Sequence, residues 1–187
     1  MSRASPAKPL AAIVFEESEK ANRLLADFAA DRARAGTRIG GIVQISANMT
    51  ECNETHVLDL ETGRRLPVLQ NLGAHSQSCR VDVTAIAEAA SLISGAILRE
   101  PELLFINRYG KLEAEGKGLF AEIGAAALSN IPTLVGVSIH HVAHWRAFTM
   151  DLAQELACSR TALDEWWHDI ALAAPRVQVQ SLTAPEP

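Results

Sequence analysis

Short apolar segments alternate with amphipathic segments along most of this chain. Residues 10–15 form one apolar run, and further runs lie at 38–45, 103–106 and 131–137. A short apolar run of this kind is typical of a strand buried on both faces, as strands of parallel sheets are. Strands that alternate with helices at this spacing predict a three-layer α/β fold with a mostly parallel sheet and right-handed crossovers.

Between the predicted strands, apolar residues recur at the three- and four-residue spacing of a helix that packs one face. Ser18, Asp82 and Ser159 are suitable N-caps, and Gly36 and Pro101 end or follow a helix. The charged, glycine-rich residues 107–118 are predicted to form a loop after the third strand. The predicted helices run from Ser18 to Gly36, from Asp82 to just before Pro101, over 119–128, over about 142–156 and over about 161–171.

Residues 46–81 differ in character from the rest. Two short runs at 56–60 and 65–70 flank Glu61-Thr62-Gly63, which predicts a β-hairpin inserted beside the main sheet. Residues 1–9 and 175–187 are dominated by polar residues and proline and are predicted to be disordered ends. Residues 10–174 are therefore expected to form a single domain.

The composition narrows the classes of partner. The 187 residues are 48% hydrophobic and 21% charged, with a net charge of -5 and no basic cluster longer than Arg64-Arg65, which argues against a nucleic acid or an anionic membrane as the main partner. No apolar stretch approaches ~20 residues and no secretory leader is recognisable, so we expect a cytoplasmic protein without membrane insertion. Three widely spaced cysteines are expected to be reduced thiols rather than a disulfide framework or a zinc site.

The segment after the first predicted strand lacks the residues of a phosphate-binding loop. It reads Phe15-Glu16-Glu17-Ser18-Glu19-Lys20 and contains no glycine. A loop that holds nucleotide phosphates needs G-x-x-x-x-G-K-[ST], so that backbone N–H groups turn inward and the lysine reaches the phosphates. Three carboxylates at this place would repel a triphosphate unless a metal intervened, and Lys20 is interpreted as a solvated helix residue.

Residues 107–118 hold the strongest candidates for ligand contact. In α/β folds, ligands bind beyond the carboxyl ends of the parallel strands, and this segment follows the third strand. Arg108, Lys111 and Lys117 are expected to clamp an oxyanion that Asn107 also contacts by hydrogen bonding, and Glu113 is a further candidate in the same loop. The alternative is an ordinary solvated loop.

Three residues elsewhere are second candidates for ligand binding. Gln44 lies near the carboxyl end of the second predicted strand, and Cys79 and Arg80 precede a helix whose exposed N–H groups favour a thiolate or an oxyanion. The structural alternative is that Asp82 caps this helix, Arg80 pairs with a carboxylate and Cys79 is a small buried residue.

Whether the histidines after the fourth predicted strand bind a metal is a question that the sequence does not answer. His140 and His144 would share a helix face, with His141 beside them, but the glutamate of H-E-x-x-H is absent and a third ligand such as Glu113 or Cys79 would have to come from elsewhere. Polar surface histidines are the simpler interpretation. We assign neither metal ligands nor catalytic residues from the sequence, and it does not identify a cofactor.

Several segments together resemble the uncharacterised bacterial family known as domain of unknown function 2478. The most specific are Asn107 to Gly118, N-R-Y-G-K-L-E-A-E-G-K-G, and Cys79 to Asp82, C-R-V-D; the resemblance extends over about residues 10–158. It implies a fold similar to that of P-loop NTPases and genes commonly found beside molybdate-transport operons. In the related NTPases an acidic pair ends the third strand, and the corresponding positions here are Asn107 and Arg108, so the resemblance implies a degenerate site in which NTP hydrolysis is in doubt.

Three functions remain open from the sequence. The leading hypothesis is a non-hydrolytic accessory protein of molybdenum metabolism that binds a small anionic ligand, either a molybdate-like oxyanion or a nucleotide. The second is a divergent Mg²⁺-dependent nucleoside triphosphatase whose metal is held by Glu16, Glu17 or Glu113. The third is a protein-interaction adaptor on an inactive NTPase-like scaffold that docks a partner protein through residues 46–81.

Overall fold

A computed structural model describes residues 7–46, 55–67, 69–70, 80–81 and 83–173 of the chain. Its main sheet has seven strands in the order β4-β3-β2-β7-β8-β1-β9, and β5 and β6 form a separate two-stranded pair. From β2 to β9 all neighbours in the main sheet are parallel, whereas β3 and β4 are antiparallel. The strands are β1 (Leu10–Phe15), β2 (Ile39–Ser46), β3 (Thr55–Asp59), β4 (Arg65–Pro67), β5 (Leu69–Gln70), β6 (Arg80–Val81), β7 (Leu103–Tyr109), β8 (Thr133–Ser138) and β9 (Ala153–Ala157).

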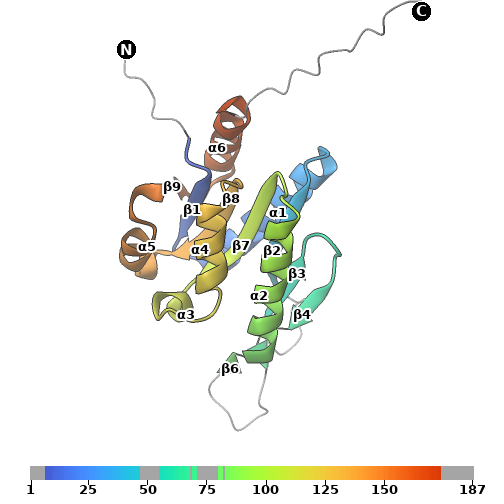
Figure 1. Cartoon of the computed structure of the whole chain (residues 1–187), viewed down its shortest axis with the longest axis vertical. Helices are drawn as coiled ribbons and strands as arrows, with labels where there is room; N and C mark the ends of the chain where they lie inside the picture. Colours follow the sequence, from blue (N-terminus) through green and yellow to red (C-terminus); the bar gives the residue numbers. More distant parts are fainter. Residues whose placement is uncertain (1–6, 47–54, 68, 71–79, 82, 174–187) are drawn as a thin grey trace, which may run out of the picture.

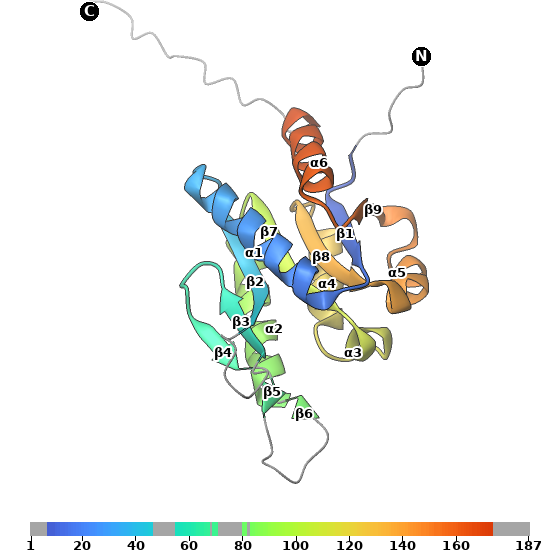
Figure 2. The same cartoon turned by 180° about the vertical axis from the view of Figure 1, so that it is seen from behind.

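Helices cover both faces of the sheet, which confirms the predicted three-layer arrangement. In Figure 1, α2 and α4 lie in front of the sheet, and in Figure 2, seen from behind, α1 lies in front. The α-helices are α1 (Ser18–Arg34), α2 (Val83–Leu98), α3 (Lys111–Ala114), α4 (Phe120–Leu128), α5 (Val142–Thr149) and α6 (Arg160–Ala173), and two 3-10 turns are η1 (Ile139–His141) and η2 (Met150–Leu152).

Two hydrophobic cores follow from the alternation of side chains along the buried strands. In β7, Leu104 and Ile106 pack under α2, α4 and α5, whereas Leu103 and Phe105 pack under α1 and α6. Each strand of this kind must be apolar at every position, which is why the sequence shows continuous apolar runs instead of alternating ones. The first core also contains Trp145, and the second contains Trp166.

The predicted hairpin exists, but it continues the main sheet instead of lying beside it. Strand β3 pairs with β2 from Ile42 to Ser46, and β4 adds the outermost strand on this side. The turn is held by Asp59, whose carboxylate accepts hydrogen bonds from the backbone N–H of Glu61 at 3.1 Å and the hydroxyl of Thr62 at 2.5 Å. Much of the remainder of 46–81 lies outside the described residues.

The helix predicted over 142–156 was wrong in its second half. Helix α5 ends at Thr149, Met150 has a positive φ of 50°, and the chain continues into the edge strand β9. The segment Ala153–Ala157 has a low content of β-branched residues, and only its pairing with β1 makes it a strand. Residues 107–118 are likewise only partly a loop, because β7 extends to Tyr109 and Lys111–Ala114 form a helical turn.

Of the nine N-terminal residues that were predicted to be disordered, 7–9 are described. The indole N–H of Trp166 donates to the backbone oxygen of Lys8 at 3.0 Å, and the N–H of Thr133 donates to the oxygen of Pro9 at 2.8 Å. These contacts connect the start of β1 to α6 and β8.

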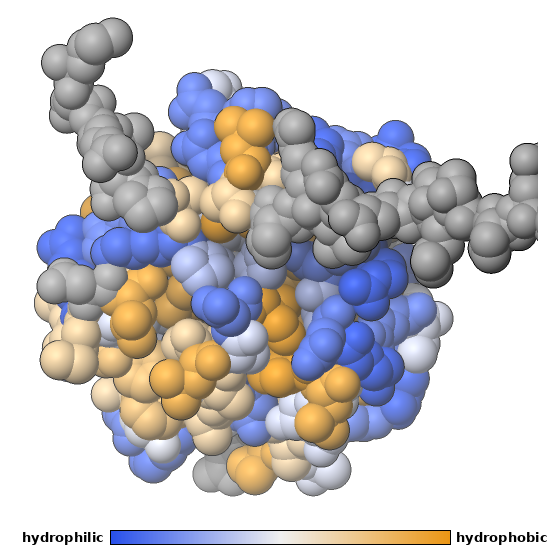
Figure 3. Space-filling model, turned by 45° about the horizontal axis from the view of Figure 1, so that its top comes forward, coloured by the Kyte–Doolittle hydropathy of each residue, from blue (hydrophilic) through white to orange (hydrophobic). Residues whose placement is uncertain are grey.

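The surface mixes apolar and polar side chains. In Figure 3, separate hydrophobic groups lie among hydrophilic ones. The large apolar residues that are more than three-fifths exposed are Val83, Leu98, Leu128, Met150 and Leu172. Within the described part of the chain, none of the helices has the length and apolar character needed to span a bilayer.

Candidate functional site at the carboxyl edge of the sheet

The carboxyl ends of β1 and β8 enclose a topological switch point. The connection after β1 leads to α1, which packs in one core with Leu25 and Phe28, whereas the connection after β8 leads to α5, which packs in the other core with Trp145. Neighbouring strands whose connections leave to opposite faces of a sheet open a crevice between them, and in α/β folds this crevice is the usual ligand position. The fold therefore places the candidate site at the start of α1.

Arg108 reaches this crevice from the end of β7. Its guanidinium donates to the hydroxyl of Ser18, the first residue of α1, at 2.8 Å. In the described part of the chain, no side chain caps the N-terminus of α1, whose N-cap residue is Glu17. A guanidinium thus lies beside uncapped backbone N–H groups of a 17-residue helix, and both features favour an anion.

A buried amide pair fixes Arg108 relative to α1. The side-chain N–H of Asn107 donates to the side-chain oxygen of Asn22 at 2.8 Å, and the two residues are 5% and 6% exposed. The other amide atom of Asn107, Oδ1, has no hydrogen-bond partner among the residues that the structure describes, and a Cβ added to Gly136 of β8 would lie 2.6 Å from it. Gly136 therefore leaves the room that the Asn107 side chain needs to reach α1.

Glu113 holds the loop after β7 together. One of its carboxylate oxygens accepts from the backbone N–H of Gly110 at 2.9 Å and the other from that of Leu119 at 3.0 Å. The residue is only 6% exposed. Both oxygens are thus engaged with backbone donors, so this carboxylate serves the loop and offers little to a ligand or metal.

An aromatic cluster packs around the last residue of β7, where the same loop begins. Tyr109 packs edge-on against Trp145 with ring centroids 5.3 Å apart, and it stacks on Phe148 at 5.9 Å. Burial, followed by the negative charge of Glu113, raises the pKa of the Tyr109 phenol. The phenol is therefore neutral at physiological pH and acts as a packing group.

The other predicted contacts lie at different places on this edge. Lys111 and Lys117 are exposed, and Lys117 pairs with Glu115 at 3.4 Å. Gln44 lies two residues beyond Ile42 on β2, as Arg108 lies two residues beyond Ile106 on β7, and Ile42 and Ile106 are paired in register. Cys79 and the side chain of Arg80 lie outside what the structure describes.

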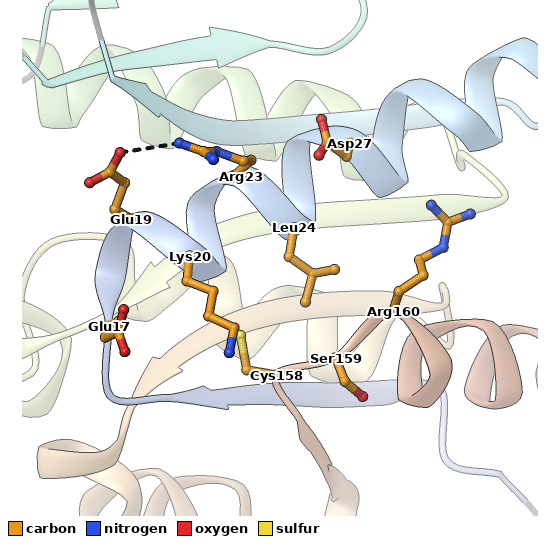
Figure 4. A pocket seen from close by; sticks show the side chains of 9 residues that line it. All are labelled: Glu17, Glu19, Lys20, Arg23, Leu24, Asp27, Cys158, Ser159 and Arg160. Atoms are coloured by element: carbon orange, nitrogen blue, oxygen red, sulfur yellow. Dashed lines mark hydrogen bonds and ion pairs between the residues drawn. The ribbon is translucent and has the colours of Figure 1, made fainter. Parts of the chain in front are cut away.

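A second polar region adjoins the first turn of α1, where the chain leaves β9. Figure 4 shows Lys20 extending from α1 toward Cys158. Glu17 lies at the start of α1, and Arg160 lies at the start of α6. These residues line a cavity of about 650 Å³. Burial raises the pKa of the Cys158 thiol; the charge of Lys20 lowers this pKa and that of Glu17 raises it, so the burial effect prevails and the thiol is protonated at neutral pH.

The histidines after β8 do not gather into a cluster. His140 and His141 lie in η1 and His144 lies in α5, and His140 and His144 are both exposed. Within the described ranges, no three His, Cys, Asp or Glu side chains come close enough together to hold a metal ion.

Sequence reasoning missed Asn22 and Cys158 as parts of this edge, whereas Lys20, interpreted as a solvated helix residue, is indeed an exposed residue of α1. Asn22 carried a usable signal, because it falls on the apolar stripe of α1 between Ala21 and Leu25, where a polar residue needs a buried partner. Cys158 could not be found, because the segment before it was interpreted as a helix and the strand end that positions it was not predicted.

With this geometry established, comparison with known proteins identifies the family. A family model described as protein of unknown function DUF2478 matches residues 10–166. The chain belongs to this family. The match covers β1 through the first half of α6 and thus includes Arg108, Ser18 and the buried amide pair.

Solved structures confirm the P-loop NTPase-like fold of this DUF2478 protein. It is similar to THEP1 from the hyperthermophile Aquifex aeolicus, with a TM-score of 0.63 and 16% identity over 86% of this chain and 95% of that one. It is also similar to a human cancer-related nucleoside triphosphatase, with a TM-score of 0.60 and 14% identity over 87% and 95% of the two chains. At such identities the likeness concerns the fold.

A curated relative is closer in sequence. The molybdenum import ATP-binding protein ModC 2 of Bradyrhizobium diazoefficiens is 35% identical over 173 residues, which is 90% of this chain and 19% of that protein. The chain thus spans about a fifth of this relative.

Proposed function

We propose that this protein binds a small anion, either a molybdate-like oxyanion or a nucleotide, at the carboxyl edge of its sheet without hydrolysing it. The observation that carries the proposal is the contact between Arg108 and Ser18 at the switch point, which sets a cation against the uncapped N-terminus of α1. Asn107 and Gln44 belong to the same edge, and Lys111 and Lys117 are the cations that a bound anion would recruit from the loop after β7. The absence of a glycine-rich loop argues against hydrolysis.

The proposal predicts binding that depends on Arg108. Thermal unfolding of the purified protein is measured with molybdate, tungstate, sulfate, ATP and GTP, each with and without Mg²⁺. A ligand at ~100 times its Kd adds ~2.7 kcal/mol to native stability, which raises the melting temperature by several degrees. Arg108→Ala should abolish the shift. Arg38→Ala removes an exposed cation at the opposite edge, where it lies 3.5 Å from Glu102, and should leave the shift unchanged. A shift that survives in Arg108→Ala contradicts the proposal.

An association with molybdate import is the second part of the proposal. It is supported by the relative named as a molybdenum import ATP-binding protein, in which the similar region makes up only a fifth of the chain. We infer a cytoplasmic accessory role beside such an ATP-binding protein. Size-exclusion chromatography of the purified chain mixed with the ATP-binding subunit of a molybdate importer should show co-elution. Replacing residues 55–67 with a short linker tests whether the β3–β4 hairpin carries the contact, and separate elution of the intact proteins would contradict the association.

A Mg²⁺-dependent nucleoside triphosphatase is the alternative, and the exposed carboxylates of Glu16 and Glu17 beside α1 favour it. The Glu17→Gln variant separates the two functions. Under anion binding, removal of a negative charge beside the site tightens the binding of molybdate or metal-free ATP about 2- to 5-fold, from ~0.5–1 kcal/mol of relieved repulsion. Under hydrolysis, the same change weakens Mg²⁺-ATP binding and lowers phosphate release. Phosphate release that stays at the buffer background with the wild-type protein contradicts the alternative.

A further inference from the structure

Helices on the two faces of the main sheet expose different kinds of side chain. On one face, the exposed residues include Arg23 and Asp27 of α1 and Asp164 and Glu165 of α6. On the other face, α2 and α4 are described over their whole lengths, and no charged residue is among their exposed residues. The side of a helix that faces water in a monomer is normally charged or polar. The outer side of α2 and α4 is therefore suited to a contact with another molecule.

The outer side of these two helices also exposes large apolar side chains. Val83, Leu98 and Leu128 are 80%, 84% and 83% exposed. Helices α2 and α4 pack in the same core and contact each other, and Figure 1 shows them in front of the sheet. Leu98 and Leu128 end helices that lead into the parallel strands β7 and β8, so both lie toward the amino edge of the sheet. Exposed apolar residues on neighbouring elements mark an interaction surface, and we call the exposed residues of α2 and α4 the α2–α4 face.

Polar groups beside the α2–α4 face already have partners within the chain. Each of the two helices contains a single charged residue, Glu88 in α2 and Glu122 in α4, and both are partly buried. Glu88 forms an ion pair with Arg64 of the hairpin turn at 2.6 Å. The hydroxyl of Ser91 donates to the backbone oxygen of Ala87 at 3.0 Å, and it keeps this hydrogen bond when water leaves. Covering the face therefore removes the partner of neither the Glu88 carboxylate nor the Ser91 donor.

We propose that the α2–α4 face binds the same face of a second copy of this chain in a two-fold symmetric dimer. In a two-fold interface each surface meets itself, so charged residues near the axis face like charges. The chain carries a net charge of -5. Among the α-helices, all of which lie in the described ranges, only α2 and α4 expose no charged residue; α3 exposes Lys111 and α5 exposes Arg146. The α2–α4 face is thus the helical surface on which two copies meet without like-charge repulsion, whereas a different partner is normally selected by complementary charges.

The order of residues along α2 fits antiparallel packing against α2 of the second copy. Ser91 lies midway between Val83 and Leu98, the first and last residues of this helix. With the two-fold axis at Ser91, Val83 of each copy lies opposite Leu98 of the other. The small residues Ala87 and Ser94 lie between these ends and let the two helices approach closely. The exposed apolar side chains at both ends of α2 are covered in this arrangement.

Analytical ultracentrifugation of the full chain tests this interface. At about 100 µM the wild type should sediment with twice the 20.1 kDa mass of one chain, because self-association depends on concentration. Ala87→Glu buries an unpaired charge in the α2–α4 face and should weaken the dimer at least 10-fold. Ala30→Glu adds the same charge at an exposed position of α1, on the other face of the sheet, and should change the dimer less than 2-fold. Far-UV circular dichroism checks that both variants fold, and Ala125→Glu of α4 replaces Ala87→Glu if that variant does not.

Cross-linking provides a second readout, which depends on the position of the axis. The background is a Cys52→Ser, Cys79→Ser, Cys158→Ser variant. Ser91→Cys in this background places a thiol beside the same thiol of the second copy and should give an intermolecular disulfide on mild oxidation. Ala30→Cys, on α1, should cross-link at least 10-fold less.

Three results would overturn the inference. They are a wild type that stays monomeric at about 100 µM, a dimer that survives Ala87→Glu, and equal cross-linking of the Ser91→Cys and Ala30→Cys variants. A mass above that of one chain that appears only with the ATP-binding subunit of a molybdate importer would assign the face to that protein and also overturn the dimer. The inference is independent of the proposed function, because the anion site lies beside α1; a shift that depends on Arg108 in a monomeric wild type would leave the proposed function standing.

Discussion

At the scale of single residues, the loop after β7 shows how a site-like composition can serve the fold. The sequence places Glu113 among cations and glycines at the end of a strand, which favours a ligand contact. In the structure its two carboxylate oxygens accept from Gly110 and Leu119. Arg108, from the same segment, instead points to Ser18 and retains the features expected of an anion-binding residue. The types of residue alone did not separate these two roles, because the direction of each side chain depends on the turn that follows the strand.

The structural role of Glu113 predicts a large effect on stability. Glu113→Ala leaves two backbone N–H groups without an acceptor, one of them in a buried hydrogen bond, and should lower the free energy of unfolding by about 2–4 kcal/mol. Glu115→Ala, in the same turn, removes only an exposed pair with Lys117 and should cost less than about 0.5 kcal/mol. Urea denaturation of the three proteins measures both differences. Equal effects of the two substitutions would show that the Glu113 hydrogen bonds contribute little.

At the scale of elements, continuous apolar runs predicted β1, β7 and β8 well, because strands buried on both faces are apolar at every position. The sequence failed at β9. This edge strand has one neighbour, and its residues Ala153 to Ala157 do not alternate strictly: the first two are partly buried, Leu156 is buried, and the other two are exposed. A pattern without strict alternation is also compatible with a helix. The cavity that Val142 of α5 and Leu156 of β9 line was missed for the same reason, since β9 forms one of its walls.

Glycine in β2 marks a close approach of two strands. Gly41 has φ of +88°, and a Cβ there would overlap the backbone oxygen of Phe105 in β7; Gly63 has φ of +73° in the hairpin turn with open space around it. Gly63→Ala should cost about 1–2 kcal/mol, from backbone strain alone. Gly41→Ala adds the overlap with β7 and should cost at least 2 kcal/mol more. Thermal unfolding compares the two variants, and similar losses would contradict the close approach.

The ion pair between α5 and β9 predicts a pH-dependent contribution to stability. The hydrogen bond from Arg146, opposed by burial and supported by the charge of Arg146, lowers the pKa of Glu155 below its ordinary value of 4.5. A carboxyl whose pKa is lowered by folding stabilises the protein above its ordinary pKa, and this contribution is lost as the pH falls through the lowered value. The denaturation midpoint of the wild type should therefore exceed that of Glu155→Gln at pH 7 and approach it below pH 4.5.

The exposed Glu165 of α6 supplies the control for this pair. Glu165→Gln should follow the wild type through the same pH range, because this carboxylate lies outside the Arg146 contact. A difference between wild type and Glu155→Gln that stays constant down to pH 3 would contradict the assignment.

At the scale of the whole molecule, the alternation of strands and helices predicted the fold class, and the position of the site followed from topology. Ligands of parallel sheets bind at the carboxyl edge, so Asn107 and Arg108 could be selected from the sequence. Their pairing with Ser18 and Asn22 could not be predicted, because these partners lie 90 and 85 residues away along the chain. Only the strand order, with β1 inserted between β8 and β9, brings α1 beside the end of β7.

The central claim is that an anion binds at the start of α1 beside Arg108. The most direct measurement is a titration of ¹⁵N-labelled protein with molybdate and then with GTP, followed by the backbone amide signals. The account predicts that the largest shifts occur at residues 17–20 and 108–110, with smaller changes elsewhere. Largest shifts in the hairpin at 55–67 or along α2, or no shift with either probe, would contradict it.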